Sequence, residues 1–140
     1  MAKASPDHLA AVPLFSALTK PDLREVLQAA DEIEVEPGRE LTTEGRVGHE
    51  FFMILEGEAD VLRGGESIRI LNPGDYFGEL ALLDHGPRSA TVVAKTPMKL
   101  LVLGQREFGG LVENVPGLAA KLLPGLAHRL REVDATAWSY

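Results

Sequence analysis

The sequence contains no cysteine and no apolar run long enough to cross a membrane. The absence of cysteine excludes disulfide scaffolds, thiol nucleophiles and thiolate metal sites. The longest short apolar run, FFMIL at Phe51–Leu55, is far from the roughly 20 residues that a membrane-spanning helix needs. The first residues, MAKASPDHL, hold a single Lys and no following apolar stretch, which does not fit a secretory signal. We therefore expect a cytoplasmic protein that does not act at a membrane.

Basic residues are outnumbered by acidic ones. The chain has 14 Lys and Arg against 21 Asp and Glu, a formal net charge of -7. Proteins that bind nucleic acid present a basic face, because contacts to phosphates dominate their affinity. We therefore expect no nucleic acid binding by this chain. Any anionic ligand must be captured by local groups against an unfavourable overall field.

Residues for metal binding or catalysis are not grouped in the sequence. The histidines are His8, His49, His85 and His128. Their spacing matches no metal-binding pattern, and no Gly-x-Ser-x-Gly nucleophile motif is present. The sequence thus predicts no metal site and no catalytic residue. A cupin-type metal enzyme is the enzymatic alternative, and it would need clustered histidines together with a carboxylate.

The length and composition predict one domain over residues 1–140. A chain of 140 residues that is 45% hydrophobic is large enough for a single core. The periodicity divides it into an N-terminal helical segment (1–30), a β-region (31–103) and C-terminal helices (104–140). Nothing in the pattern indicates an internal repeat or a low-complexity linker.

Two helical pieces are expected in the N-terminal segment. Residues 20–30 are predicted to form a helix, with a looser helical piece over 9–18. Thr19 and Asp22 can cap the first of these reciprocally, and Pro21 is tolerated in a first turn. Four apolar residues recur at helical spacing: Leu23, Val26, Leu27 and Ala30.

The β-region shows the alternation that is typical of strands. Ile33 and Val35 alternate with acidic residues, and Pro-Gly or single Gly residues separate the strand segments. Many short strands with regular turns predict a mainly β fold with flanking helices, an antiparallel jelly-roll-like β-barrel that is closed or sandwiched. Closure would also remove exposed sheet edges.

The C-terminal part predicts two helices. QREFGGLVENV, residues 105–115, indicates a short helix weakened by its two glycines. A longer helix is expected after Pro116, and because a helix-interior Pro clashes with the carbonyl four residues earlier, Pro124-Gly125 should kink or restart it. The stripe on this helix indicates packing or a dimer seam rather than ligand contact; its residues are Leu126, Leu130, Val133 and Ala137.

The stretch FGELALLDHGPRSATV, residues 77–92, breaks the strand pattern. A short helical turn starting near Gly78 or Glu79 would present unpaired backbone N–H groups, which attract anions. The Arg88 guanidinium and the Ser89 hydroxyl would complement a phosphate. Glu79 would then accept from ligand hydroxyls. The ordinary alternative is that Glu79 and Arg88 form a surface pair of little energetic weight.

The same stretch resembles the phosphate-binding cassette of the cyclic nucleotide-binding domain family. The resemblance is carried by GDYFGELALL, residues 74–83, and PRSATV, residues 87–92. PGRELTTEGRVGHEFFMILEGEADV resembles the early strands of that family, and VPLFSALTKPDLREVL resembles its N-terminal helical segment. The resemblance therefore extends over nearly the whole chain. His49 stands where the family commonly has Asp, and we assign it no role.

The resemblance implies a ligand site at six residues: Gly78, Glu79, Leu80, Ala81, Arg88 and Ser89. It implies that Glu79 accepts from the ribose 2′-hydroxyl and that Arg88 pairs with the cyclic phosphate. Ser89 favours cAMP over cGMP as the ligand, although members with a hydroxyl here accept either. Leu71 and Val92 are candidates for the wall near the base, but we expect them to be core residues in the first place.

The resemblance further implies a non-catalytic sensor that signals through its C-terminal helices, with no cofactor besides the nucleotide. A homodimer or a protein partner would engage through these helices. By location alone, four residues are candidates to cover the base: Arg129, Arg131, Trp138 and Tyr140. Their ordinary interpretation is that they belong to a solvated helix end and tail. The alternative is an interaction domain of the same fold whose ligand is lost or changed.

Overall fold

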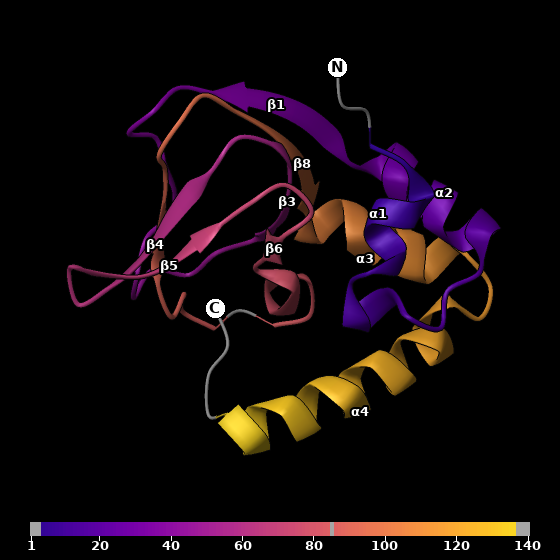
Figure 1. Ribbon diagram of the computed structural model, residues 1–140. Helices are drawn as coiled ribbons and strands as arrows, with labels where there is room; N and C mark the ends of the chain where they lie inside the picture. Colours follow the sequence, from indigo (N-terminus) through magenta and orange to yellow (C-terminus); the bar gives the residue numbers. More distant parts are fainter. Residues whose placement is uncertain (1–3, 85, 137–140) are drawn as a thin grey trace.

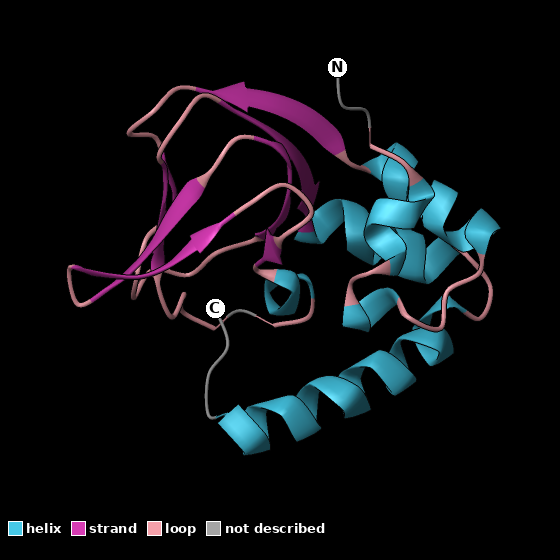
Figure 2. Cartoon of the chain, viewed as in Figure 1, coloured by secondary structure: helices cyan, strands magenta, loops and turns pink. Residues whose placement is uncertain are grey.

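The helices gather on one side of the molecule and the strands on the other in the computed structural model (Figures 1 and 2). The structure describes residues 4–84 and 86–136. The N-terminal segment holds α1 (Pro6–Ala10), the 3-10 turn η1 (Pro13–Phe15) and α2 (Lys20–Ala29). The C-terminal part holds α3 (Gln105–Asn114) and α4 (Leu118–Thr136). The short 3-10 turn η2 (Glu79–Leu82) lies among the strands.

The strands form two four-stranded antiparallel sheets. The first has the order β1 (Asp31–Val35), β8 (Met98–Gly104), β3 (Glu50–Glu56) and β6 (Tyr76–Phe77). The second has the order β2 (Glu40–Thr42), β7 (Thr91–Ala94), β4 (Ala59–Arg63) and β5 (Glu66–Leu71). The mainly β, jelly-roll-like fold with flanking helices is therefore confirmed.

The sheets do not close into a barrel, which corrects the closed form of the prediction. Among the described residues each sheet keeps two edge strands, β1 and β6 in the first and β2 and β5 in the second. Two local features shorten the strand pairing at the edges of the sheets. β6 pairs through only two residues before η2 begins, and β2 loses register at a bulge between Glu40 and Thr42.

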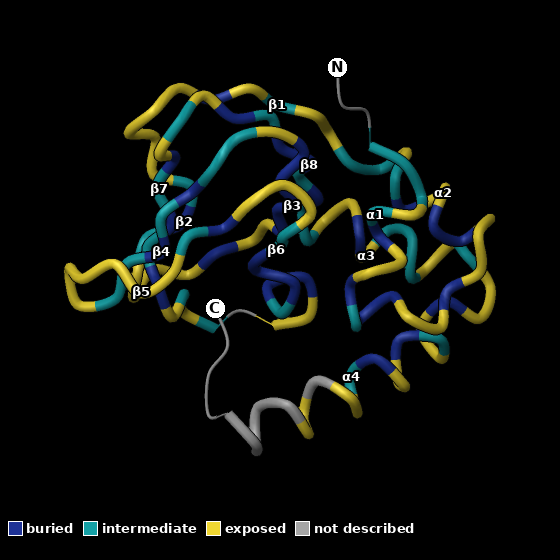
Figure 3. Tube along the Cα trace, in the orientation of Figure 1, coloured by how far each residue is buried: buried dark blue, intermediate teal, exposed yellow. Residues whose placement is uncertain are grey.

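Strand β3 lies between the two apolar clusters of the core. Its five central residues, FFMIL, are all buried, as expected for a strand covered on both faces. Phe51 and Met53 belong to the apolar cluster shared with the helices, whereas Phe52 and Ile54 belong to the cluster between the two sheets. Figure 3 shows this buried strand in dark blue between exposed outer segments. The molecule thus has three layers: helices, first sheet and second sheet.

α2 begins where the sequence predicts, whereas the looser helical piece expected over 9–18 is instead divided into α1 and η1. The Thr19 N–H donates to Asp22 Oδ2 at 2.9 Å, and the Asp22 N–H donates to Thr19 Oγ1 at 3.3 Å, which completes the capping box of α2. Phe15 of η1 then packs against Phe51 and Phe108, with ring centroids 5.9 Å apart in both pairs. These rings join η1, β3 and α3 in one core.

α4 runs without interruption through Pro124, so of the two expected outcomes, a kink or a restart, the restart is wrong. The reason lies in tertiary contact. A Cβ at Gly125 would lie 2.1 Å from the Pro13 carbonyl oxygen, so the α4 backbone approaches η1 more closely than any side chain allows. Leu118 and Leu122 bury on the same side, and this packing outweighs the hydrogen bond that Pro124 cannot make.

Only part of the predicted apolar stripe of α4 packs against the core. Leu126 packs against the helical core cluster, but Leu130 is 67% exposed. Ala137 and the side chain of Val133 lie outside the described residues. The first half of α4 therefore packs against the core, whereas Ala127, His128, Leu130 and Arg131 are exposed.

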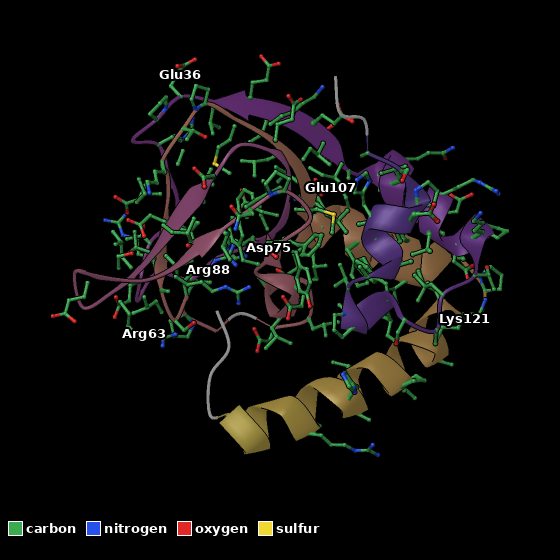
Figure 4. All side chains as sticks on the ribbon, in the orientation of Figure 1. Glu36, Arg63, Asp75, Arg88, Glu107 and Lys121 are labelled. Atoms are coloured by element: carbon green, nitrogen blue, oxygen red, sulfur yellow. The ribbon has the colours of Figure 1, made fainter. Side chains whose placement is uncertain are left out.

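An ion pair fastens α4 to the N-terminal helices. Lys121 Nζ lies 2.7 Å from Asp22 Oδ2. This ammonium group, together with the Thr19 N–H, holds the pKa of the Asp22 carboxyl below its ordinary value of 3.8. The same carboxylate thus caps α2 and holds α4 (Figure 4 labels Lys121).

We predict that Asp22→Asn lowers the free energy of unfolding by about 1–2 kcal/mol at neutral pH, because an amide can still cap α2 but cannot pair with Lys121. A carboxyl whose pKa is depressed by folding stabilises above its unfolded pKa and loses this contribution as pH falls through the folded pKa. Urea titrations should therefore show a constant difference near neutrality that shrinks below about pH 4. Asp7→Asn, at an exposed site in α1, is the control. A difference that does not change with pH would contradict the assignment.

Candidate functional site

The turn from β6 into η2 is made by Gly78. Its φ of +81° is in the left-handed region, which glycine occupies without strain. Phe77 on the preceding strand stacks on Phe52 with centroids 4.9 Å apart, which fixes where the turn begins. The short helical turn that the sequence predicts at Gly78 or Glu79 is therefore confirmed as η2.

The Arg88 guanidinium lies between two glycines. A Cβ at Gly48 would fall 1.8 Å from Arg88 Nε, and one at Gly78 would fall 2.4 Å from Arg88 Nη1. Arg88 Nη2 donates to the Glu50 carbonyl oxygen at 2.6 Å. Both glycines are thus required to leave room for this side chain, which enters from a distant loop (Figure 4).

Burial changes the electrostatics of Arg88. Desolvation lowers the pKa of its guanidinium from the ordinary value, and the nearby negative charge of Glu50 partly opposes this effect. Its Nε is buried and has no hydrogen-bond partner among the described residues. A partly buried cation with an unused donor gains from an anionic acceptor, because water screens it less than on an open surface.

Backbone and side-chain hydrogen bonds hold the loop that carries Arg88. The Arg88 N–H donates to the Arg46 carbonyl at 2.8 Å, and the Gly45 N–H donates to the Arg88 carbonyl at 2.8 Å. Arg63 Nε donates to the Ser89 carbonyl at 3.0 Å, and Thr42 Oγ1 donates to the Ala90 carbonyl at 3.0 Å. The guanidinium is therefore presented by a fixed backbone.

A cavity of about 200 Å³ lies beside this loop. Its lining contains five of the six residues that the sequence singles out: Gly78, Leu80, Ala81, Arg88 and Ser89. It also contains Asp84, Gly86 and Pro87, which the sequence reasoning left out. Their position in the loop between η2 and Arg88 could have identified them from the sequence as lining residues. Gly48 and the Glu50 carbonyl were also missed, since only the fold brings them to Arg88.

Glu79 lies apart from the lining of this cavity. It is the first residue of η2 and only 3% exposed, between two residues that line the cavity. Its role toward a sugar hydroxyl therefore stays a prediction. Leu71 and Val92 belong to the apolar cluster between the sheets, each 1% exposed, in agreement with their interpretation as core residues first.

Most of the candidates for covering the base lie outside the described residues. Trp138, Tyr140 and the side chain of Arg129 are outside the described residues, and Arg131 is exposed. Over residues 4–84 and 86–136, no three His, Asp or Glu side chains are grouped so that they could hold a metal ion. In the same residues no helix is long and apolar enough to cross a membrane.

Comparison with known families decides what this arrangement is. Residues 32–115 match the family model of the cyclic nucleotide-binding domain, a segment that includes both sheets from β1 on, the Arg88 loop and α3. The chain belongs to the cyclic nucleotide-binding domain family. Residues 77–92 are thus the part of this domain that resembles its phosphate-binding cassette.

Relatives of this cyclic nucleotide-binding domain occur in larger proteins. The cAMP-dependent protein kinase regulatory subunit of Colletotrichum orbiculare is 39% identical over 114 residues, which are 80% of this chain and 29% of that protein. The corresponding subunit of Yarrowia lipolytica is 43% identical over 103 residues, 72% of this chain and 28% of that protein. The chain therefore spans less than a third of these curated relatives.

Two solved structures have similar folds. The N-terminal domain of a transcriptional regulator from Streptomyces coelicolor A3(2) has a TM-score of 0.82 and 30% identity, covering 96% of this chain and 97% of that one. The regulatory domain of Toxoplasma gondii PKA, crystallised with cAMP, has a TM-score of 0.67 and 34% identity, covering 76% of this chain and 42% of that one. Proteins of different kinds therefore share the fold of this cyclic nucleotide-binding domain.

We predict that Gly48→Ala costs about 1–3 kcal/mol of stability, because the new methyl group must displace the Arg88 side chain. In an Arg88→Ala background the space is vacated, so the same substitution should cost little. Urea unfolding of the four proteins in this double-mutant cycle measures the coupling. Equal losses in both backgrounds would show that Gly48 acts through something other than Arg88.

Proposed function

We propose that this domain binds cAMP reversibly and performs no catalysis. The observation that carries the proposal is the Arg88 guanidinium, held between Gly48 and Gly78 at the wall of a cavity of about 200 Å³. An anion that reaches this guanidinium gains a charge-assisted interaction in partly desolvated surroundings. Because the chain as a whole is acidic, such a local cation is the feature that would select a phosphate.

The proposed contacts follow from the lining of the cavity. Arg88 pairs with the cyclic phosphate, with hydrogen bonds from Ser89 and from backbone N–H groups near Gly78, Leu80 and Ala81. Glu79 accepts from the ribose 2′-hydroxyl. The cavity is smaller than the roughly 300–1,000 Å³ of pockets that enclose whole drug-sized ligands. In this proposal it holds the phosphate and sugar, and the base extends beyond it.

The comparisons support the choice of ligand. The relatives reported above are named cAMP-dependent protein kinase regulatory subunits, and one structural neighbour was crystallised with cAMP. Ser89 after the cassette Arg is compatible with cAMP and with cGMP, so cGMP is the alternative nucleotide. The other alternative is an interaction domain of the same fold without this ligand.

We further propose that the domain signals through its C-terminal helices. Leu82 of η2 is buried in the same apolar cluster as Phe108 of α3 and Leu118 of α4. Gln105 Nε2, on the first residue of α3, donates to the Asp84 carbonyl at 3.1 Å. A ligand that favours one position of the cassette would therefore favour one position of these helices, through its differential affinity for the two states.

We predict that calorimetry with purified protein detects cAMP binding and that cAMP raises the melting temperature. Arg88→Ala should lose about 2–5 kcal/mol of binding free energy, or roughly 30-fold or more in affinity. The matched control is Arg46→Ala, which removes an exposed cation from the facing loop but keeps the carbonyl that accepts from Arg88. Absence of heat and of a thermal shift with millimolar cAMP or cGMP would favour the interaction domain.

We predict that Gln105→Met leaves cAMP affinity within about threefold, because Gln105 does not line the cavity. The substitution removes the side-chain bond to Asp84, so cAMP should then slow amide hydrogen exchange in the cassette but much less in α3. Hydrogen exchange followed by mass spectrometry compares the two proteins. Unchanged protection of α3 in the variant would argue against this bond as the connection.

A further inference from the structure

Helical glycines in this molecule fall into two kinds. At Gly125 in α4 a Cβ would meet the Pro13 carbonyl, so a neighbour inside the chain requires the glycine. Gly109 and Gly110 lie in the middle of α3, and a Cβ on either would meet nothing within 4 Å. Glycine is a poor helix former, and packing among the described residues gives no reason for this pair. Of the two, Gly110 lies in a groove.

The groove is a cavity of about 580 Å³ between α2 and α3. Its lining is mostly apolar or small and comes from both helices and the residues after α3: Glu25, Ala29, Glu107, Gly110, Leu111, Asn114, Val115 and Pro116. Ala29, Leu111 and Val115 are partly buried and continue the helical core cluster to the surface. Gly110 adds no side chain to this floor, and its carbonyl accepts from Asn114 Nδ2 at 2.8 Å.

The charge around the groove is negative. Glu25 and Glu107 are exposed on its two helices (Figure 4 labels Glu107), and none of the lining residues is basic. Ala29 and Asn114 are the last residues of α2 and α3, so the carbonyl ends of both helices add partial negative charge. A basic partner is therefore favoured and an acidic one is repelled.

We propose that this groove is a docking site for a helical segment of a partner protein. The segment carries an apolar stripe that packs on Ala29, Leu111 and Val115 and approaches the backbone at Gly110, with Lys or Arg beside the stripe facing Glu25 and Glu107. A helix fits because its side-chain ridge can enter the space between α2 and α3, where Gly110 has no side chain and a Cβ would meet nothing within 4 Å. This inference does not depend on nucleotide binding, since the groove and the Arg88 cavity share no lining residue.

The test is selection of peptides from a displayed library of random 16-residue sequences on the immobilised chain. The expected result is enrichment of peptides with apolar residues at helical spacing and flanking Lys or Arg. Fluorescence anisotropy of the best peptide should show at least a tenfold loss of affinity on Gly110→Gln, which adds a side chain to the groove at a position where a Cβ would meet nothing within 4 Å. The affinity should also fall on Glu25→Lys and weaken as salt is added.

Gly109→Gln is the matched control, because it adds the same side chain to the same helix at an exposed position outside the groove lining. It should retain the affinity, and both variants should melt no lower than the parent chain because glutamine is the better helix former. Enrichment only of acidic peptides, or of peptides that bind Gly110→Gln and Gly109→Gln equally, would overturn the proposal. Self-association abolished by Gly110→Gln would assign the groove to a second copy instead.

Discussion

The burial of β3 on both faces is the constraint on which the rest of the structure depends. A strand with five successive apolar residues is stable only when both of its faces are covered. The helices cover one face and the second sheet covers the other, and this fixes the three layers. The same strand begins at Glu50, whose carbonyl oxygen accepts from Arg88. The core and the candidate site therefore share one backbone element.

Several features of this fold could be predicted because local chemistry decides them. The capping box at Thr19 and Asp22 needs only residues three apart, and the turn at Gly78 needs only a glycine before a helical run. The cassette residues 77–92 were recognisable for the same reason, since most of the cavity lining comes from one continuous stretch. Local residue order was enough where partners are close in the chain.

The features that could not be predicted depend on contacts between distant residues. Gly48 and the Glu50 carbonyl reach Arg88 from about 40 positions earlier, and the sequence gives no signal of that approach. The continuity of α4 through Pro124 rests on Gly125 meeting Pro13, from the opposite end of the chain. The open sheets likewise follow from a bulge and a two-residue strand, which alternation alone does not reveal.

Pro124 gives α4 a defined point of weakness. Because Pro124 has no N–H, the Ala120 carbonyl lacks its helical donor, and bending the helix costs least at that turn. On both sides of this turn α4 is bound to the N-terminal helices: Leu118, Lys121 and Leu122 precede Pro124, and Gly125 and Leu126 follow it. The bound part of α4 therefore reaches Leu126, and Leu130, which is 67% exposed, lies beyond it. A small rotation of this bound part becomes a displacement of several ångströms near Thr136, at roughly 1.5 Å of helix per residue.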